Sequence, residues 1–141
     1  LRLILVGPKP KKEELDDHLK NWIKSNPGAI HCLQNLPENI LGELYKSAKA
    51  LVFPSFIEGF GWPPLEAAVR GCPIITTRTG AIADLLENYA KYVDAENQVS
   101  INQGVLELLR SPGDKNDSVT LPSHEDCRRQ YFDLYEQMMA N

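Results

Sequence analysis

Apolar residues in this chain alternate between short continuous runs and stripes at helical spacing. The runs Leu1–Val6, Ala50–Phe53 and Pro73–Thr76 are short and largely apolar. This pattern is typical of parallel strands that are covered on both faces. Two further strands are expected at Ala29–Leu33 and Tyr89–Val93, where short apolar runs follow turn residues.

Apolar stripes with a spacing of three and four residues lie between these runs and predict helices. The expected helices are Lys12–Ser25, Glu38–Ala48, Pro63–Arg70, Ala81–Glu87 and a segment marked by Ile101, Val105, Leu108 and Leu109. The first of them should carry Glu13 and Glu14 in its first turn and should stop at Asn26-Pro27-Gly28.

A last helix is expected after Ser111–Ser118, which is the only stretch with linker composition. Ser123 and Asp126 form the start of a capping box. One face of this helix is apolar and is expected to pack rather than to form a site. Its residues are Cys127, Tyr131, Leu134, Tyr135 and Met138.

The alternation of strands and helices predicts an α/β fold with a Rossmann-like parallel sheet flanked by helices. The chain has 141 residues, so one domain covering residues 1–141 is expected. Ligands of such sheets bind at the carboxyl ends of the strands. Candidate functional residues are therefore sought in the segments that directly follow a strand.

Composition narrows the function classes. The net charge of -4 argues against nucleic acid as the main partner. Three widely spaced cysteines without a CxxC pair indicate neither a disulfide framework nor a metal site, and favour a reducing compartment. No apolar run reaches the roughly 20 residues of a membrane span, so a soluble protein is expected. Because the chain opens inside an apparent strand, without methionine, we interpret it as a fragment.

The segment PSFIEGFGWPPLEAAVRGCP combines glycines, prolines and acids directly after a predicted strand. Gly59 and Gly61 permit positive φ and close approach of a ligand to the backbone. Pro63 and Pro64 are suited to the first turn of a helix, and Gly71 to its C-terminal cap. A turn leading into a helix start is therefore expected, with amides available for an anion.

Glu58 and Glu66 flank this turn, with seven residues between them. Carboxylates accept hydrogen bonds from neighbouring hydroxyl groups, and the amides from Gly59 to Trp62 suit a phosphate. A nucleotide sugar, with its ribose, diphosphate and hexose, matches this layout. In the alternative interpretation, Glu58 is a solvated loop acid and Glu66 complements the helix dipole.

The stretch PSFIEGFGWPPLEAAVRGCPIITT resembles the E-x7-E signature of family-four retaining glycosyltransferases, which have the GT-B fold. The flanking segments LRLILVG, LGELYKSAKALVFPS and TGAIADLL resemble the same family. The resemblance implies the C-terminal, donor-binding half of a two-domain enzyme. Such an enzyme transfers a sugar from a nucleotide diphosphate sugar to a hydroxyl acceptor on a saccharide, lipid-linked or other glycan, generally without a bound metal or cofactor.

The resemblance also implies roles for individual residues. Glu58 would contact the donor sugar and is the expected catalytic residue, because it would orient and electrostatically support the donor. The backbone of Gly59, Phe60, Gly61 and Trp62 would touch sugar and diphosphate. Glu66 would bind the ribose hydroxyls.

The chain departs from the family pattern at several points. Trp62 replaces the usual leucine, Gln34 a common glycine and Asp84 a frequent glutamate. This chain has no counterpart of the family's basic diphosphate clamp, which lies on a strand that is normally first and central in the sheet. It also has no counterpart of the N-terminal acceptor domain. We therefore expect the isolated chain to be inactive without its missing N-terminal partner.

Other basic residues are weaker candidates. Lys9, Lys11 and Lys12 follow the first strand and could face a diphosphate, although a solvated charge run is the simpler interpretation. Arg78 and Thr79 follow a later strand and could line the same cleft. Three histidines lack metal-ligand or triad spacing and are interpreted as structural; they are His18, His31 and His124.

Two rival functions stay open. One is a nucleotide-sugar epimerase or phosphorylase with the same fold, and the other is a non-catalytic nucleotide-binding or scaffolding module. The leading interpretation predicts a cytoplasmic protein that is at most peripheral at the inner membrane face.

Overall fold

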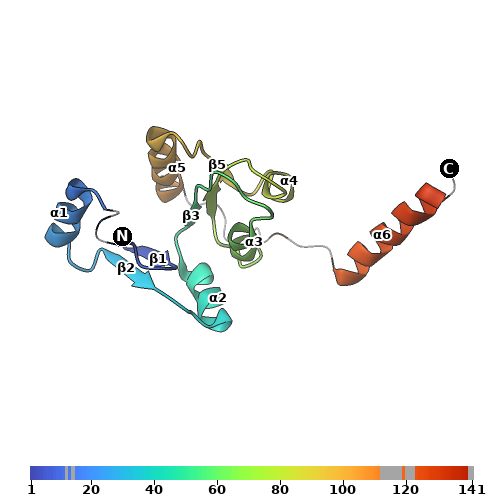
Figure 1. The fold of residues 1–141 in the computed structure, drawn as a ribbon, viewed down its shortest axis with the longest axis horizontal. Coiled ribbons are helices and arrows are strands. Elements are labelled where there is room, and N and C mark those ends of the chain that lie inside the picture. The colour runs from blue at the N-terminus through green and yellow to red at the C-terminus, as the bar shows by residue number, and fades with distance from the viewer. Residues whose placement is uncertain (12, 14, 112–118, 120–122, 140–141) are drawn as a thin grey trace. The chain divides into compact units, whose positions relative to one another are not determined.

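The computed structural model describes residues 1–11, 13, 15–111, 119 and 123–139. It divides into two compact units, Leu1–Leu41 and Gly42–Asn141, shown as a ribbon in Figure 1. The boundary falls within helix α2 (Glu38–Ser47). Each unit is described separately below.

The first unit contains strand β1 (Leu3–Val6), helix α1 (Asp17–Ser25) and strand β2 (Ile30–Leu33). The two strands pair in parallel, as predicted, with Leu3 opposite Ile30. Their bounds agree with the sequence prediction to within two residues.

The predicted start of α1 is wrong by five residues. The helix begins at Asp17 because Asp16 caps it, its carboxylate accepting the Leu19 N–H at 2.8 Å. Glu13 therefore lies outside the helix, while Lys12 and Glu14 lie outside the described residues. The predicted stop is confirmed, since Asn26 forms the C-terminal cap.

The apolar strand β1 is less covered than its sequence suggests. Leu3 and Val6 are 48% and 49% exposed within the described structure. With two strands and one complete helix, this unit has too little surface to cover both faces of its sheet. The expectation of a fully buried first strand is therefore not met.

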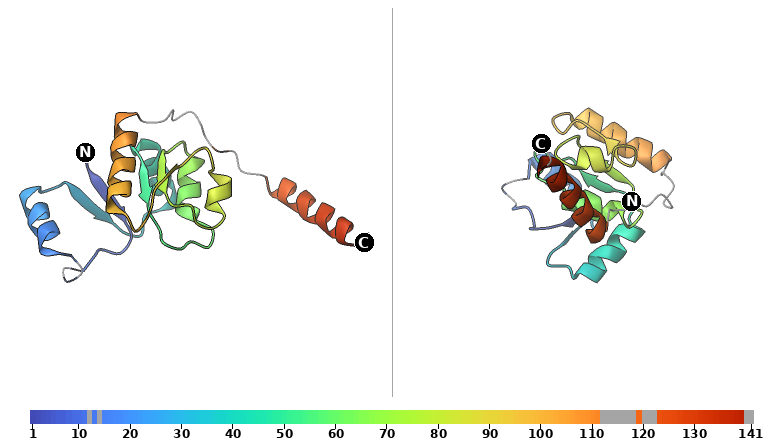
Figure 2. Two further views of the ribbon diagram at one scale, coloured as in Figure 1. Left: turned by 90° about the horizontal axis from the view of Figure 1, so that it is seen from above. Right: turned by 90° about the vertical axis from the view of Figure 1, so that its right-hand side faces the viewer.

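The second unit is built on a three-stranded parallel sheet in the order β3-β4-β5. Its strands are β3 (Leu51–Phe53), β4 (Ile74–Thr76) and β5 (Lys91–Tyr92). Its helices are the end of α2, α3 (Trp62–Ala68), α4 (Ile82–Leu85), α5 (Gln98–Arg110) and α6 (His124–Met139). Figures 1 and 2 show α5 and α3 on opposite sides of the sheet. The predicted α/β class with parallel strands and flanking helices is confirmed.

The core of the second unit surrounds the central strand β4, against which α3 and α5 pack. Ile74 and Ile75 of the central strand and Ile82 of α4 are fully buried. Ala67 and Ala68 are also fully buried, and their small side chains let α3 lie close to β3 and β4. This packing fixes the segment that joins β3 to α3.

Helix α6 has the predicted capping box. The Ser123 hydroxyl accepts the Asp126 N–H, and the Asp126 carboxylate accepts the Ser123 N–H, both at 3.1 Å. The Ser123 hydroxyl also donates to the Asp126 carboxylate at 2.6 Å, and this bond, together with the one from the Ser123 N–H, holds the pKa of Asp126 below its usual value. The apolar stripe of this helix is exposed, with Tyr131 66% accessible. No helix in the described part of the chain is long and apolar enough to cross a membrane.

Candidate functional site

The segment between β3 and α3 follows the carboxyl end of a strand, where the sequence places the candidate site. It is tied to the residues that end β4. The Thr76 hydroxyl donates to the Phe53 carbonyl at 3.0 Å, and the Thr77 hydroxyl donates to the Ser55 carbonyl at 2.6 Å. Two adjacent threonines therefore fix the start of the loop.

Two glycines bring this loop against the one that follows β4. Gly61 has φ 85°, and a Cβ there would lie 2.2 Å from Ile82 Cγ1. Gly80 has φ 59°, and a Cβ there would lie 2.7 Å from the Glu58 carbonyl oxygen. Both positions combine a left-handed backbone with a close approach, which only glycine tolerates. The two loops therefore interlock.

Gly59 differs from its neighbour. Its φ is not positive, and a Cβ there would have open space around it. Of the two glycines singled out for positive φ, only Gly61 uses it. A side chain at position 59 would therefore meet no other described atom.

The amides of this loop have no partners within the described residues. None of the N–H groups of Gly59, Phe60, Gly61 and Trp62 donates a hydrogen bond to another described residue. The first bond at the helix start comes from the Leu65 N–H to the Gly61 carbonyl, at 3.3 Å. The loop therefore presents four consecutive N–H donors.

Helix α3 is shifted from its predicted bounds. It begins at Trp62, one residue early, because Gly61 acts as the N-terminal cap. It ends at Ala68 rather than Arg70, since the Cys72 N–H turns back to the Ala67 carbonyl at 2.9 Å. Gly71 has φ 68°, as expected of a residue that terminates a helix.

Glu66 lies in the middle of α3 and is partly exposed. Its Oε2 atom is 3.4 Å from the hydroxyl of Tyr45, on α2. Its backbone carbonyl accepts a hydrogen bond from the Arg70 guanidinium at 2.9 Å. Burial, with the neighbouring Glu66 charge, raises the pKa of Tyr45 to about 12.

Glu58 lies in the loop and is also partly exposed. Its carboxylate forms no hydrogen bond or ion pair with any described residue. Nearby, the rings of Phe60 and Trp62 contact each other with centroids 4.7 Å apart. Trp62 is 63% exposed, so it adds an aromatic surface beside the loop.

All six candidate residues therefore lie on one continuous loop and helix at the carboxyl end of β3. Sequence reasoning missed the residues that support them. Tyr45 lies within the helix predicted at Glu38–Ala48, and the signal available for its role is its hydroxyl, which needs a partner when buried. The role of Gly80 against Glu58 had no signal in the local pattern.

Arg78 was considered as a residue lining the same cleft. Its guanidinium lies over the Tyr92 ring, 4.3 Å from the centroid, a cation-π contact. The Tyr92 hydroxyl donates to the Ala83 carbonyl at 3.3 Å. Burial raises the pKa of Tyr92, while the Arg78 charge opposes this shift. Arg78 thus braces the loop after β4.

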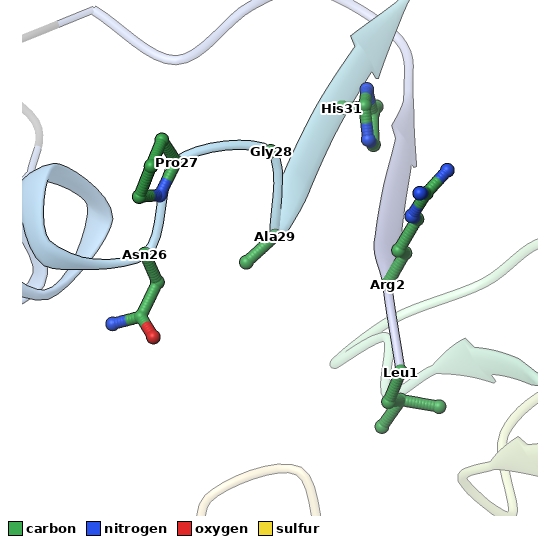
Figure 3. A pocket seen from close by; sticks show the side chains of 7 residues that line it. All are labelled: Leu1, Arg2, Asn26, Pro27, Gly28, Ala29 and His31. Carbon is green, nitrogen blue, oxygen red and sulfur yellow. The ribbon is translucent and has the colours of Figure 1, made fainter.

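A surface hollow of about 380 Å³ occurs in the first unit (Figure 3). It lies at the amino ends of β1 and β2, whereas parallel sheets bind ligands at their carboxyl ends. Its lining residues are Leu1, Arg2, Asn26, Pro27, Gly28, Ala29 and His31. Across the described residues, no group of histidine, cysteine and acidic side chains is arranged to hold a metal ion.

Comparison with known proteins identifies the class. Residues 1–122 match the family model described as glycosyl transferases group 1. The chain therefore belongs to this family of glycosyltransferases. This finding supports the coarser part of the sequence prediction, a glycosyltransferase domain of the GT-B type.

Individual relatives agree with this assignment. The chain is 32% identical over 109 residues to the O-antigen chain mannosyltransferase RfbU of Salmonella typhimurium, a match covering 77% of this chain and 30% of that protein. It is 36% identical over 77 residues to the serotype-specific mannosyltransferase WbdA of Escherichia coli, covering 55% and 9%. The chain thus spans less than a third of the length of these relatives.

A solved structure supports the fold. The crystal structure of AviGT4, a glycosyltransferase involved in avilamycin A biosynthesis, matches 99% of this chain and 44% of its own, with a TM-score of 0.57. The sequence identity is 18%. At this identity the likeness concerns the fold alone.

Proposed function

We propose that this chain is the donor-binding domain of a retaining glycosyltransferase. Its proposed reaction is sugar transfer from a nucleotide diphosphate sugar to a hydroxyl acceptor on a glycan. The observation that carries the proposal is the loop after β3, where four consecutive amides and the Glu58 carboxylate have no hydrogen-bond partner among the described residues. A separate N-terminal domain would supply the acceptor site.

Each part of the loop has a proposed partner on the donor. The amides from Gly59 to Trp62 would donate to the diphosphate, whose negative charge grows as the sugar leaves. Glu58 would accept hydrogen bonds from the donor sugar. Glu66 would accept hydrogen bonds from the ribose hydroxyls.

The contribution of this domain to the rate would be positioning and electrostatic stabilisation. The interlocked glycines Gly61 and Gly80 hold the loop in one shape before the donor arrives. A preformed loop loses little conformational entropy on binding. No metal or cofactor would be needed in this scheme, because the loop amides would offset part of the charge of the diphosphate.

Mannose is the first sugar to test. Several relatives carry the name mannosyltransferase, among them the RfbU and WbdA proteins. However, a probable sucrose-phosphate synthase of Craterostigma plantagineum is 39% identical over 67 residues, covering 45% of this chain. The similarity therefore supports the reaction class more strongly than one sugar. We propose a cytoplasmic location that is at most peripheral at the inner membrane face.

Calorimetry on the full-length protein tests this proposal. GDP, UDP and ADP are titrated separately, followed by the sugar nucleotide of the preferred base. Selective binding of one nucleoside diphosphate, with transfer that retains the anomeric configuration, is the expected result. Absence of nucleotide binding would favour a scaffolding module, and phosphate-dependent sugar release would favour a phosphorylase.

A further inference from the structure

We infer that Tyr45 is a positioning residue that holds the Glu66 carboxylate ready for the ribose of the donor. This inference rests on the proposed function, because it concerns the same site. Tyr45 itself would touch no part of the donor. It would act through one carboxylate oxygen of Glu66.

The contact joins two helices that are distant in sequence. Tyr45 belongs to α2 and Glu66 to α3, and the Tyr45 hydroxyl is 3.4 Å from Glu66 Oε2. Tyr45 is buried, with 8% of its surface exposed. A buried hydroxyl needs a hydrogen-bond partner, and Glu66 Oε2 supplies it. Because the phenol donates its single proton there, Oε1 is left to accept from a ligand.

The tyrosine is itself held in place. The Arg70 guanidinium lies 5.9 Å from the centre of the Tyr45 ring and donates to the Glu66 backbone carbonyl. Gly42 leaves room for this arginine, because a Cβ there would lie 3.1 Å from Arg70 Nε. Tyr45, Glu66 and Arg70 therefore form one packed cluster between α2 and α3.

The hydroxyl stays protonated throughout the working range of an enzyme. Burial and the Glu66 charge raise the pKa of Tyr45 to about 12. Near neutral pH the Tyr45 hydroxyl therefore keeps the proton that it donates to Glu66 Oε2. The separation of 3.4 Å is long for a hydroxyl to carboxylate bond, so the expected effect on affinity is moderate.

The test is Tyr45→Phe in the full-length protein. Phenylalanine keeps the ring and its packing but removes the hydroxyl. We expect the KM for the donor to rise about 3- to 10-fold, the range of one modest hydrogen bond. The kcat should stay within about twofold, because the hydroxyl does not contact the reacting atoms.

A second comparison separates positioning from packing. Binding is measured for the preferred nucleoside diphosphate and for its 2′,3′-dideoxy analogue, which lacks the hydroxyls that Glu66 would bind. Tyr45→Phe should lower the affinity for the nucleotide with an intact ribose and leave the affinity for the dideoxy nucleotide unchanged. The double variant with Glu66→Gln should show no loss beyond that of Glu66→Gln alone.

Tyr89→Phe is the matched control. The Tyr89 hydroxyl donates to the Cys72 carbonyl at 3.1 Å rather than to Glu66, so the same chemical change leaves the contact between Tyr45 and Glu66 in place. This variant should bind both nucleotides as the parent does. Thermal unfolding of each variant checks that the fold is retained.

Two results would overturn the inference in distinguishable ways. In the first, Tyr45→Phe weakens binding of the ribose and dideoxy nucleotides equally, or weakens binding of neither, while Glu66→Gln weakens binding of the ribose nucleotide alone. Tyr45 is then a packing residue, and the proposed function stands. If the parent binds no nucleoside diphosphate, the proposed function fails and the inference fails with it.

Discussion

The two acids of the motif, Glu58 and Glu66, differ in how far contacts within the protein fix their positions. Glu66 lies on a helix, its carbonyl is bound by Arg70 and its carboxylate faces the Tyr45 hydroxyl. Glu58 lies on a loop whose backbone is pressed against Gly80, while its carboxylate has no partner among the described residues. The protein thus orients one acid through its own contacts, while the other would be oriented by the donor in the proposed function.

This difference separates stability from function within one short segment. A partly exposed carboxylate without partners among the described residues contributes little to the free energy of folding. An acid that packs in a cluster contributes to both.

Glu58→Gln should affect catalysis most. If the carboxylate orients and electrostatically supports the donor sugar, its loss should lower kcat by about 100- to 1000-fold, as for other preorganised polar groups. The melting temperature should stay within about 2 °C, because the side chain has no partner to lose. Steady-state kinetics and thermal unfolding of the full-length protein measure both. An unchanged kcat would show that Glu58 is only a solvated loop acid.

Gly61→Ala should destabilise the loop strongly. The new methyl group would clash with Ile82 and would occupy a left-handed backbone position, which together cost about 2 to 4 kcal/mol. Gly59→Ala is the control, since its Cβ meets open space and its φ is not positive. Its effect should stay below about 1 kcal/mol. Urea unfolding measures both, and equal losses would contradict the interlocked loop.

Glu66→Gln should mainly weaken donor binding. Replacing a charged acceptor of ribose hydroxyls should raise the donor KM about 10-fold, with kcat changed less than by Glu58→Gln. Donor titrations of both variants provide the measurement. A larger fall in kcat for Glu66→Gln than for Glu58→Gln would reverse the assigned roles.

The smallest effect concerns alkaline pH. The folded pKa of Tyr45 is about 12, against 10.0 for an unperturbed tyrosine, so folding favours the protonated phenol. This stabilisation is complete below pH 10.0 and is lost as the pH rises towards about 12. The free energy of unfolding should therefore fall over this range more steeply in the parent than in Tyr45→Phe. Parallel slopes would show that Tyr45 is not coupled to its surroundings.

Much of the fold was predictable because it depends on local pattern. Strand bounds agree to within two residues, since short apolar runs with turn residues at their ends have few alternatives. Helix ends were predicted less well. The start of α1 depends on which of several acids provides the cap, and hydrogen bonds of the folded chain decide this for Asp16.

The sequence predicts the loop and acids of the candidate site but not the residues that support them. Its loop and acids follow one another along the chain, so a pattern search finds them. The supporting residues come from other elements, because Tyr45 precedes β3 and Gly80 follows β4. Their contacts with Glu66 and Glu58 are tertiary, and no local periodicity encodes them.

The most direct measurement is a crystal structure of the full-length protein with its preferred nucleoside diphosphate bound. We predict that diphosphate oxygens lie within hydrogen-bond distance of the amides between Gly59 and Trp62, and that the ribose hydroxyls donate to the Glu66 carboxylate. A nucleotide bound away from this loop, or a ribose whose hydroxyls face solvent, would contradict it.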